Sequence, residues 1–454
     1  MFIKIICIAI LILLSGNITA DNYYFKHFGI KEGLSQQTIS CAIQDKKGFI
    51  WFGTKIGLNR FDGIRFKQYL SNKNNKYSLI DNQIFCMTES TNGVIWIGTA
   101  NGLCKYDPVK DMFEAFNNED ISINGSIYNL TFDKQENLWV TNSDGIYCLN
   151  FRTDKYLFFS SKDYFIPSSI TVTKSGSIWF SSLDGNIYLY NQQRQDFYKM
   201  SILTEQEKKQ HVLIHKMLEC PNGDLIIATD RVGVKLFSPN NSDVTTLFKN
   251  DSYDNPIYIH TIAQVNEDDF WIGTENGIYI YSLKNGFIKH IQKSYNNEYS
   301  LSDNAVHVLL KDREDGIWVG TFFGGVNYLS NDQTFFSRYL PKNNKGEIVA
   351  NVIREIHSDD NGNLWIGTED GGLCNFNIKN GMFDSVKWNN YNINRNIQCL
   401  MIDKNNIWIG TFDNGIYLYD LYNKKIVKHY CTENNSGLLV NSTVSIKKYQ
   451  IMIF

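Results

Sequence analysis

The sequence predicts an all-β fold, a seven-bladed β-propeller followed by the truncated start of a second propeller. Three observations predict it: a short phrase recurs, its copies are evenly spaced, and Gly-containing turns separate short apolar strands. The phrase runs apolar residue, Trp, Ile or Phe, Gly, Thr, two variable residues and Gly, and its nine variants lie about 40 to 47 residues apart. Such a period is typical of propeller blades, each of which is one four-stranded sheet. The nine anchors are Trp51, Trp96, Trp139, Trp179, Ile226, Trp271, Trp318, Trp365 and Trp408.

The second copy illustrates how one repeat builds one blade. Strands are expected near residues 84–87, 94–99, 103–106 and 112–116, and Asn101-Gly102 between two of them suits the positive φ of a tight hairpin turn. Because side chains alternate along a strand, Trp96 and Gly98 share one face and Ile97 the other. Both faces are therefore expected to be covered, and we interpret the Trp residues as packing between blades rather than as sugar platforms.

The order of the strands predicts where a ring closes. Residues 23–28 resemble the outermost strand of a blade but precede the first repeat, so we expect them to pair with the seventh repeat. Residues 334–339 look like a second such strand, which we interpret as the opening of a second ring. The chain is thus predicted to comprise a signal peptide (1–20), a seven-bladed propeller (21–338), and two blades with a partial third of an incomplete propeller (339–454). Extrapolating the period places the tenth Trp about one residue past Phe454, so a truncated fragment is expected.

The N-terminus and the charge balance suggest where the chain works. Lys4, the apolar run from Ile5 to Leu14 and the small polar residues up to Ala20 are typical of a signal peptide. No later stretch approaches the roughly 20 apolar residues of a membrane helix. The mature chain is therefore expected to be periplasmic and to lack a transmembrane segment. With 44 Lys and Arg against 47 Asp and Glu, the net charge of -3 makes nucleic acid an unexpected partner.

Cysteine and histidine positions predict neither disulfides nor a metal. Cys41 and Cys86 both lie ten residues before the Trp of their repeats, a recurrence that fits small buried side chains better than bonded partners. No close Cys and His cluster is present along the chain, so no metal or other cofactor is expected. The eight His residues are interpreted as ordinary strand residues. The capping-box pattern Thr204–Glu207 is interpreted as part of a surface loop rather than a helix.

The residues of the first repeat resemble a known family. Gly33-Leu34-Ser35, Ile43–Asp45, Gly48–Thr54 and Gly57–Gly63 are closely similar to the two-component-regulator propeller repeat, and the resemblance covers almost all of the mature chain. It implies the periplasmic ligand-sensing region of a hybrid two-component sensor histidine kinase, present as a fragment without the kinase. It also implies an oligosaccharide ligand and a homodimer for the intact protein, and no catalytic residues or enzymatic activity in this region.

Two other functions remain open. A propeller can serve as a scaffold for protein–protein interaction. A propeller glycosidase such as a sialidase is the enzyme alternative, because the turns Asp45–Gly48 and Asp359–Gly362 are similar to Asp-box turns. Hairpin geometry by itself demands a turn that starts with Asp and ends with Gly, so this similarity is shallow.

Unusual turns supply the candidate binding residues. The turn that reads Asn-Gly or Asp-Gly in other repeats carries Arg231, Phe322, Phe323 and Phe412 in repeats five, seven and nine. Exposed aromatic side chains in such turns suit sugar stacking or a protein contact. The alternative, packing against a neighbouring blade or a second ring, stays open.

Overall fold

The computed structural model of the protein describes residues 23–116, 118, 121–251, 253–295, 297–331, 339, 341, 348, 350–386, 396–434 and 436–447. In this part of the chain the secondary structure consists of strands with three short helical segments: η1 (Ile30–Glu32), α2 (Glu205–Lys208) and η2 (Thr432–Asn434). The all-β fold class is confirmed. The chain divides into two compact units, residues 1–333 and 334–454.

Seven four-stranded antiparallel sheets make up the described part of the first unit. In spatial order within each sheet, they are β2 (Ile39–Gln44), β3 (Ile50–Thr54), β4 (Leu58–Phe61) and β5 (Phe66–Tyr69); β6 (Ile84–Glu89), β7 (Ile95–Thr99), β8 (Gly102–Asp107) and β9 (Met112–Ala115); β10 (Ile127–Phe132), β11 (Leu138–Asn142), β12 (Gly145–Asn150) and β13 (Lys155–Ser160); β14 (Pro167–Val172), β15 (Ile178–Ser182), β16 (Asn186–Asn191) and β17 (Asp196–Ser201); β18 (Ile214–Glu219), β19 (Leu225–Thr229), β20 (Val234–Ser238) and β21 (Asp243–Phe248); β22 (Ile259–Gln264), β23 (Asp269–Thr274), β24 (Gly277–Ser282) and β25 (Gly286–Ile291); and β26 (Val306–Lys311), β27 (Ile317–Thr321), β28 (Val326–Leu329) and β1 (Lys26–Phe28).

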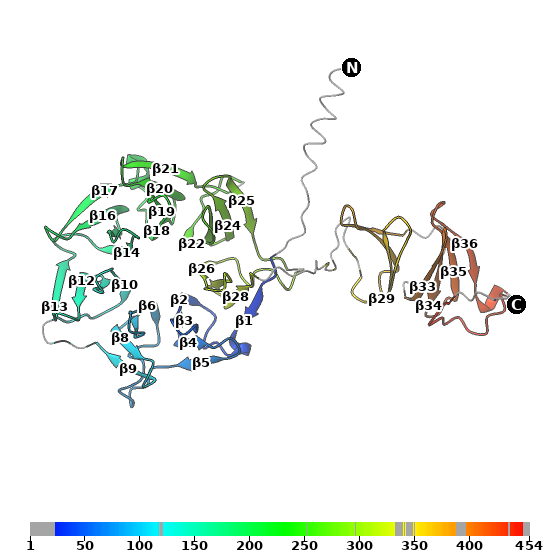
Figure 1. The fold of residues 1–454 in the computed structure, drawn as a ribbon, viewed down its shortest axis with the longest axis horizontal. Coiled ribbons are helices and arrows are strands. Elements are labelled where there is room, and N and C mark those ends of the chain that lie inside the picture. Colours follow the sequence, from blue (N-terminus) through cyan, green and yellow to red (C-terminus); the bar gives the residue numbers. More distant parts are fainter. Residues whose placement is uncertain are drawn as a thin grey trace, which may run out of the picture. The chain divides into compact units, whose positions relative to one another are not determined.

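These sheets form a closed ring (Figure 1). The first strand of each sheet contacts the first strand of the next, and β26 of the last sheet contacts β2 of the first. The N-terminal strand β1 completes the last sheet, since Lys26 pairs with Tyr328 and Phe28 with Val326. This pairing leaves no open edge between the start and the end of the ring, and closure removes a surface on which other chains could add strands.

The second unit contains two further four-stranded sheets within the described residues. They are β29 (Ile353–Ser358), β30 (Leu364–Thr368), β31 (Leu373–Asn377) and β32 (Met382–Ser385), then β33 (Ile397–Asp403), β34 (Asn406–Thr411), β35 (Ile416–Asp420) and β36 (Lys425–Tyr430). Their first strands, β29 and β33, contact each other as neighbouring blades do in the ring.

Apolar side chains fill the space between neighbouring sheets, as the alternation of the repeat predicts. Trp51 of the first sheet packs on Tyr69 and on Tyr106 of the second sheet, with ring centroids 5.6 and 5.0 Å apart. Its side chain is 1% exposed. Burying one such large apolar side chain contributes about 1.5–3 kcal/mol. Each blade therefore gains stability from the blades beside it.

An aspartate six residues before the Trp fixes several of the turns between first and second strands. Asp45 accepts hydrogen bonds from the backbone N–H groups of Lys47 and Phe49 at 3.0 and 2.9 Å, and its second carboxylate oxygen accepts from Trp51 Nε1 at 2.7 Å. The same Asp-to-Trp bond is present at three more repeats, in the pairs Asp133 and Trp139, Asp312 and Trp318, and Asp359 and Trp365. The Asp-box-like turns are thus explained by their own hydrogen bonds.

Two details of the chain bear on the sequence predictions. The prediction of a loop at residues 204–207 is wrong, because Thr204 caps one helical turn, α2. Its hydroxyl accepts from Glu207 N at 3.3 Å, and its own backbone N–H donates to the Glu207 carboxylate at 2.9 Å. Glu207 also pairs with the buried Lys235 at 2.8 Å, which anchors that turn to β20. The eight cysteines described are free and all but Cys41 are buried, as predicted.

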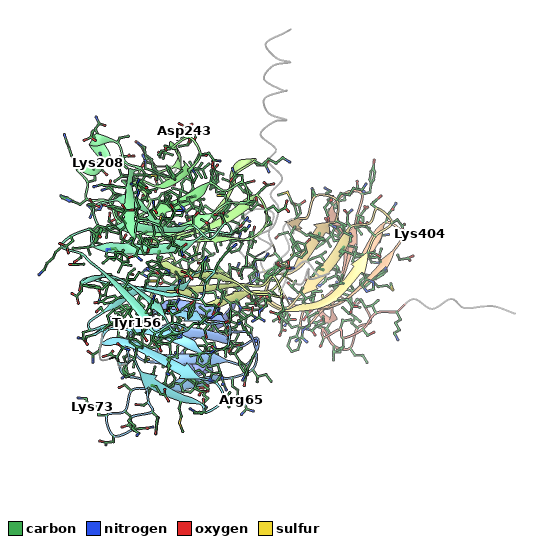
Figure 2. All side chains as sticks on the ribbon, turned by 60° about the vertical axis from the view of Figure 1, so that its left-hand side comes forward. Arg65, Lys73, Tyr156, Lys208, Asp243 and Lys404 are labelled. Carbon is green, nitrogen blue, oxygen red and sulfur yellow. The ribbon has the colours of Figure 1, made fainter. Side chains whose placement is uncertain are left out.

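Some predicted features lie outside the described residues. The signal peptide (1–20), most of the second orphan strand (334–338) and the terminal residues 448–454 belong to this group. The boundary predicted at residue 338 also stays a prediction. No helix among the described residues is both long and apolar enough to span a bilayer. In the first unit, Arg65, Lys73, Lys208 and Asp243 lie at the periphery (Figure 2).

Candidate functional site

Each sheet of the ring begins with a β-bulge at the second residue of its first strand. The pairing register shifts there, for instance between Val306 and Val308, so the residue between them has no partner on the second strand. A bulge bends the strand and re-aims its side chain, and bulges are frequent next to functional sites. The seven bulge residues are Ser40, Phe85, Tyr128, Ser168, His215, His260 and His307.

The turn between the second and third strands lies beside each bulge. Glu275 N donates to the carbonyl of Tyr258 at 3.0 Å, and Phe322 N donates to that of Ala305 at 2.9 Å. These bonds hold Glu275 and Phe322 next to the residues that precede the bulge in their own sheets. We call the end of the ring that carries the bulge residues and these turn residues the bulge face.

Gly277 shapes the turn that presents Glu275. Its φ is +97°, and a Cβ there would collide with the carbonyl oxygen of Ile291. Thr274 Oγ1 accepts from Asn276 N at 3.0 Å and donates to the Gly277 carbonyl at 2.9 Å. The Gly-Thr-x-x-Gly phrase therefore fixes where the Glu275 carboxylate can reach.

Three successive blades place a histidine at the bulge. The ring centroids of His215 and His260 are 5.4 Å apart and edge to face, while His260 and His307 stack at 4.2 Å. Glu275 Oε1 lies 2.6 Å from His260 Nε2 and 3.7 Å from His307 Nε2. The bulge face thus brings two imidazoles and one carboxylate together, with a third imidazole alongside.

Burial sets the charge of two of these histidines. Burial first and nearby His260 second lower the pKa of His307 to about 4, against the opposing effect of Glu275. Burial and His260 likewise lower the pKa of His215. Both imidazoles are therefore neutral at pH 7. His307 Nε2 is buried and has no hydrogen-bond partner, which costs about 1–3 kcal/mol for an ordinary polar atom.

Aromatic side chains continue the bulge face beyond the histidines. The Phe322 ring lies 5.1 Å from His307 and carries the Lys55 ammonium 4.5 Å above it. Phe323 packs edge to face on Phe322 at 4.6 Å and is 70% exposed. Thr38 Oγ1 donates to the Phe322 carbonyl at 2.7 Å, which ties this turn to the first blade.

The structure describes all four binding residues predicted from the sequence and brings two of them, Phe322 and Phe323, into contact. Phe322 and Phe323 lie together on the bulge face. Arg231 lies in the equivalent turn of the fifth blade, where its Nε is 3.5 Å from Asp230 Oδ2 and its Nη1 donates to the Gln210 carbonyl. Phe412 occupies the same kind of turn in the second unit and is 56% exposed. Their role in binding stays a prediction.

Sequence reasoning missed the histidines of the bulge face. His215, His260 and His307 each follow an aliphatic residue at the start of their strands, so the signal was a residue type that recurs at one repeat position in three successive repeats. Their interpretation as ordinary strand residues, and the absence of a close ligand cluster, rested on spacing along the chain. The ring brings together residues that this spacing separates.

The grooves between blades at the opposite ends of the strands have a repeated architecture. One groove is lined by Asp133 and Trp139 with residues of the next sheet. Another, in the second unit, is lined by the equivalent pair Asp359 and Trp365. Because the same positions line both, these grooves reflect how wedge-shaped sheets pack and do not single out a binding site.

Comparisons with known proteins agree with the fold and the repeat. Residues 33–55, 78–101, 300–323 and 347–370 match the two component regulator propeller family. The chain therefore carries two-component-regulator propeller repeats, as the sequence resemblance predicts. It is similar to the extracellular domain described as that of a hybrid two component system from B. thetaiotaomicron, with 25% identity and a TM-score of 0.67 over 92% of this chain and 62% of that one.

Two further relatives extend the comparison. A segment of 59 residues is 44% identical to histidine kinase P4 of Formosa agariphila, which is 13% of this chain and 4% of that protein. The virginiamycin B lyase of Staphylococcus aureus shares the fold, with 16% identity and a TM-score of 0.53 over 68% of this chain and 99% of that one. The chain thus spans less than two thirds of the first two relatives. The similarity to the extracellular domain supports a role as the sensor region of a two-component system.

Proposed function

We propose that the chain is the periplasmic, ligand-sensing region of a hybrid two-component sensor histidine kinase and that its ligand is an oligosaccharide. In this proposal the signal peptide of residues 1–20 directs export, and the kinase belongs to the intact protein. The chain itself has no enzymatic activity. The similarity to an extracellular domain of a hybrid two component system supports the sensing role.

One observation carries the choice of ligand: the aromatic pair on the bulge face, of which Phe323 is exposed. Phe323 is 70% exposed while its neighbour Phe322 is held between His307 and Lys55. An aromatic face packs against the C–H groups of a sugar ring. The nearby Lys55 ammonium, Asp303 and Glu275 offer hydrogen bonds to hydroxyl groups, in keeping with sites that combine apolar walls and a few polar groups.

Titration calorimetry against a panel of neutral and acidic oligosaccharides tests this proposal. Phe323→Ala is expected to weaken binding of the recognised glycan about 2- to 10-fold, which corresponds to about 0.5–1.5 kcal/mol for one aromatic contact. The matched control is Phe287→Ala, which removes a Phe that is 58% exposed on the outer strand β25. An equal loss in both variants, or no binding to any glycan, contradicts the proposal.

A protein-binding scaffold is the second candidate, because the same exposed ring suits a protein contact. Light scattering after size exclusion separates the two functions. Self-association that Phe323→Ala abolishes, in a chain that binds no glycan, favours the scaffold and the homodimer. Release of sugar from any glycan in the panel, checked by chromatography, contradicts the absence of enzymatic activity.

A further inference from the structure

Three side chains of the bulge face form a constellation with the chemistry of a metal site. His260, Glu275 and His307 each offer one potential ligand atom, a ring nitrogen or a carboxylate oxygen. These three atoms lie within 4.8 Å of one another. Two imidazoles and one carboxylate are the ligand set of three-ligand zinc sites, in which a fourth position stays open to solvent or ligand. Imidazole favours Zn²⁺ and related ions over Ca²⁺ and Mg²⁺, which select oxygen ligands.

The geometry is close to that required for coordination. The carboxylate oxygen of Glu275 is 2.6 Å from His260 Nε2 and 3.7 Å from His307 Nε2. Two atoms that are each about 2.0–2.1 Å from one zinc ion are at most about 4.2 Å apart. Both measured separations fall below that limit. Glu275 is 51% exposed, so solvent borders its side chain and leaves room for the carboxylate to adjust.

A second, independent observation points to a ligand at this place. His307 Nε2 is buried without a hydrogen-bond partner. Its distance to Glu275 is too long for a hydrogen bond, so a buried lone pair or N–H goes unused there.

The surroundings favour a cation. Asp303 and Glu275 both act on His307 as negative charges, and Asp230 acts in the same way on His215. The third histidine packs edge to face on His260, which restricts the orientation of that ring. A bulge in each first strand holds the two ligand imidazoles, so the backbone fixes their direction.

We propose that His260, Glu275 and His307 bind one Zn²⁺ ion on the bulge face of the ring, with an open coordination position directed away from the protein ligands. The ion takes the place of the hydrogen bond between His260 Nε2 and Glu275 Oε1, and the proton of that bond passes to solvent. The Phe322 ring borders the site through its contact with His307. The proposal rests on the arrangement of these side chains and holds whether or not the chain binds a glycan.

Direct metal titration of the full chain tests the proposal. After treatment with a chelator and dialysis, calorimetry with Zn²⁺ is expected to show one site per chain. Co²⁺ in place of Zn²⁺ is expected to give the visible absorption bands of a low-symmetry site with imidazole ligands. Ca²⁺ and Mg²⁺ are expected to bind at least tenfold more weakly than Zn²⁺.

Variants assign the ligands. His307→Ala and Glu275→Gln are each expected to weaken Zn²⁺ binding by about 100-fold or more. Loss of a residue that only hydrogen-bonds to a metal ligand already weakens binding by about 10- to 100-fold. The matched control is His357→Ala in the second unit, where His357 Nε2 also lies near a carboxylate, 3.4 Å from Glu355. This control is expected to bind Zn²⁺ as the unchanged chain does.

Circular dichroism shows whether each variant is folded, and the half-exposed Glu275 provides a test even where His307→Ala fails to fold. Absence of a stoichiometric Zn²⁺ site overturns the proposal. Zn²⁺ binding that persists in Glu275→Gln and His307→Ala, as it would if cysteines held the ion, overturns it as well. The proposal is also overturned if His357→Ala weakens Zn²⁺ binding as much as the ligand variants do.

Discussion

The closed ring and the two-sheet second unit are built from the same repeat, yet they bury the same positions to different degrees. Val306 and Leu309, on the first strand of the seventh sheet, are 0% and 4% exposed. The equivalent Ile353 and Ile356, on β29 of the second unit, are 49% and 50% exposed. In the ring the preceding sheet covers these side chains, whereas in the described part of the second unit no sheet precedes β29.

The next sheet of the second unit shows that the sequence is not the cause. On β33 the equivalent residues Ile397 and Leu400 are 0% and 3% exposed, because the sheet that starts with β29 covers them. The difference between the regions therefore lies in neighbours and not in the repeat. A blade buries its face only when another blade stands on that side, as expected for repeat proteins.

The largest expected difference in stability between the two regions concerns the Trp that anchors each repeat. Trp318 is 4% exposed and packs on Phe28, Phe52 and Phe61 across the ring closure, whereas Trp408 is only half-buried. We expect Trp318→Ala to lower the unfolding free energy of the ring by about 3–5 kcal/mol, and Trp408→Ala to destabilise its unit by less than half as much. Denaturant unfolding followed by hydrogen exchange, which separates the two units, measures both. A larger loss in Trp408→Ala contradicts the comparison.

The glycines at sheet–sheet contacts are expected to behave alike in both regions. A Cβ on Gly320 would meet Ile39 Cγ2 at 2.7 Å, and one on Gly367 would meet Ile397 Cγ2 at 2.7 Å. We therefore expect Gly320→Ala and Gly367→Ala each to cost about 1–3 kcal/mol through overpacking. Gly362 has open space around it, but Gly362→Ala is not a suitable control because its φ of +79° would strain an Ala backbone. Ser385→Ala, an exposed change on the outer strand β32, is expected to have little effect in the same unfolding experiment.

Acidification is expected to weaken one contact between neighbouring blades in the ring. Partial burial opposes ionisation of Asp111, but hydrogen bonds from Lys67, Tyr106 and Tyr69 outweigh it and lower the pKa to about 2. Because this pKa is below the ordinary value of 3.8, the contribution is complete well above pH 3.8 and is lost as the pH falls through about 2.

The variant Asp111→Asn measures that contribution. At pH 7 it is expected to lower the unfolding free energy by less than about 1 kcal/mol, because the group is half-exposed and solvent screens it. The difference from the unchanged chain should shrink as the pH falls from about 4 towards about 2. A difference that grows on acidification would show that the carboxylate destabilises the folded ring.

The smallest effect on stability is expected on the uncovered strand of the second unit. Replacing the half-exposed Ile353 and Ile356 by Thr should change the unfolding free energy by no more than about 0.5 kcal/mol, as for most surface substitutions. It should nevertheless reduce self-association, since an exposed apolar strand face promotes aggregation. Light scattering at rising protein concentration tests this, with the buried pair Val306→Thr and Leu309→Thr expected to unfold the ring instead.

Local sequence signals predicted the blade and most of its internal contacts. The alternation around Trp96 and Gly98, the Asn-Gly turn and the Asp45 turn all involve residues close in the chain, and their geometry follows from strand pleating and turn chemistry. The candidate site was predicted less well. Phe322 and Phe323 were found because their turn departs from the repeat. The histidines lie at bulges, and only their recurrence at one repeat position in three repeats signals them.

By itself, the sequence determined that the chain forms sheets of about the same size, where their turns fall, and which face of each strand is apolar. The strand order along the chain also predicted that residues 23–28 complete the seventh sheet, as β1 does. Tertiary structure alone decided that His260, Glu275 and His307 meet, and that Ile356 is exposed while Leu309 is buried. The physical reason is the distance along the chain over which each effect acts. Strand pleating and hairpin turns depend on residues only a few positions apart. Burial of a given side chain and contacts between residues of different blades arise only when the sheets pack against one another.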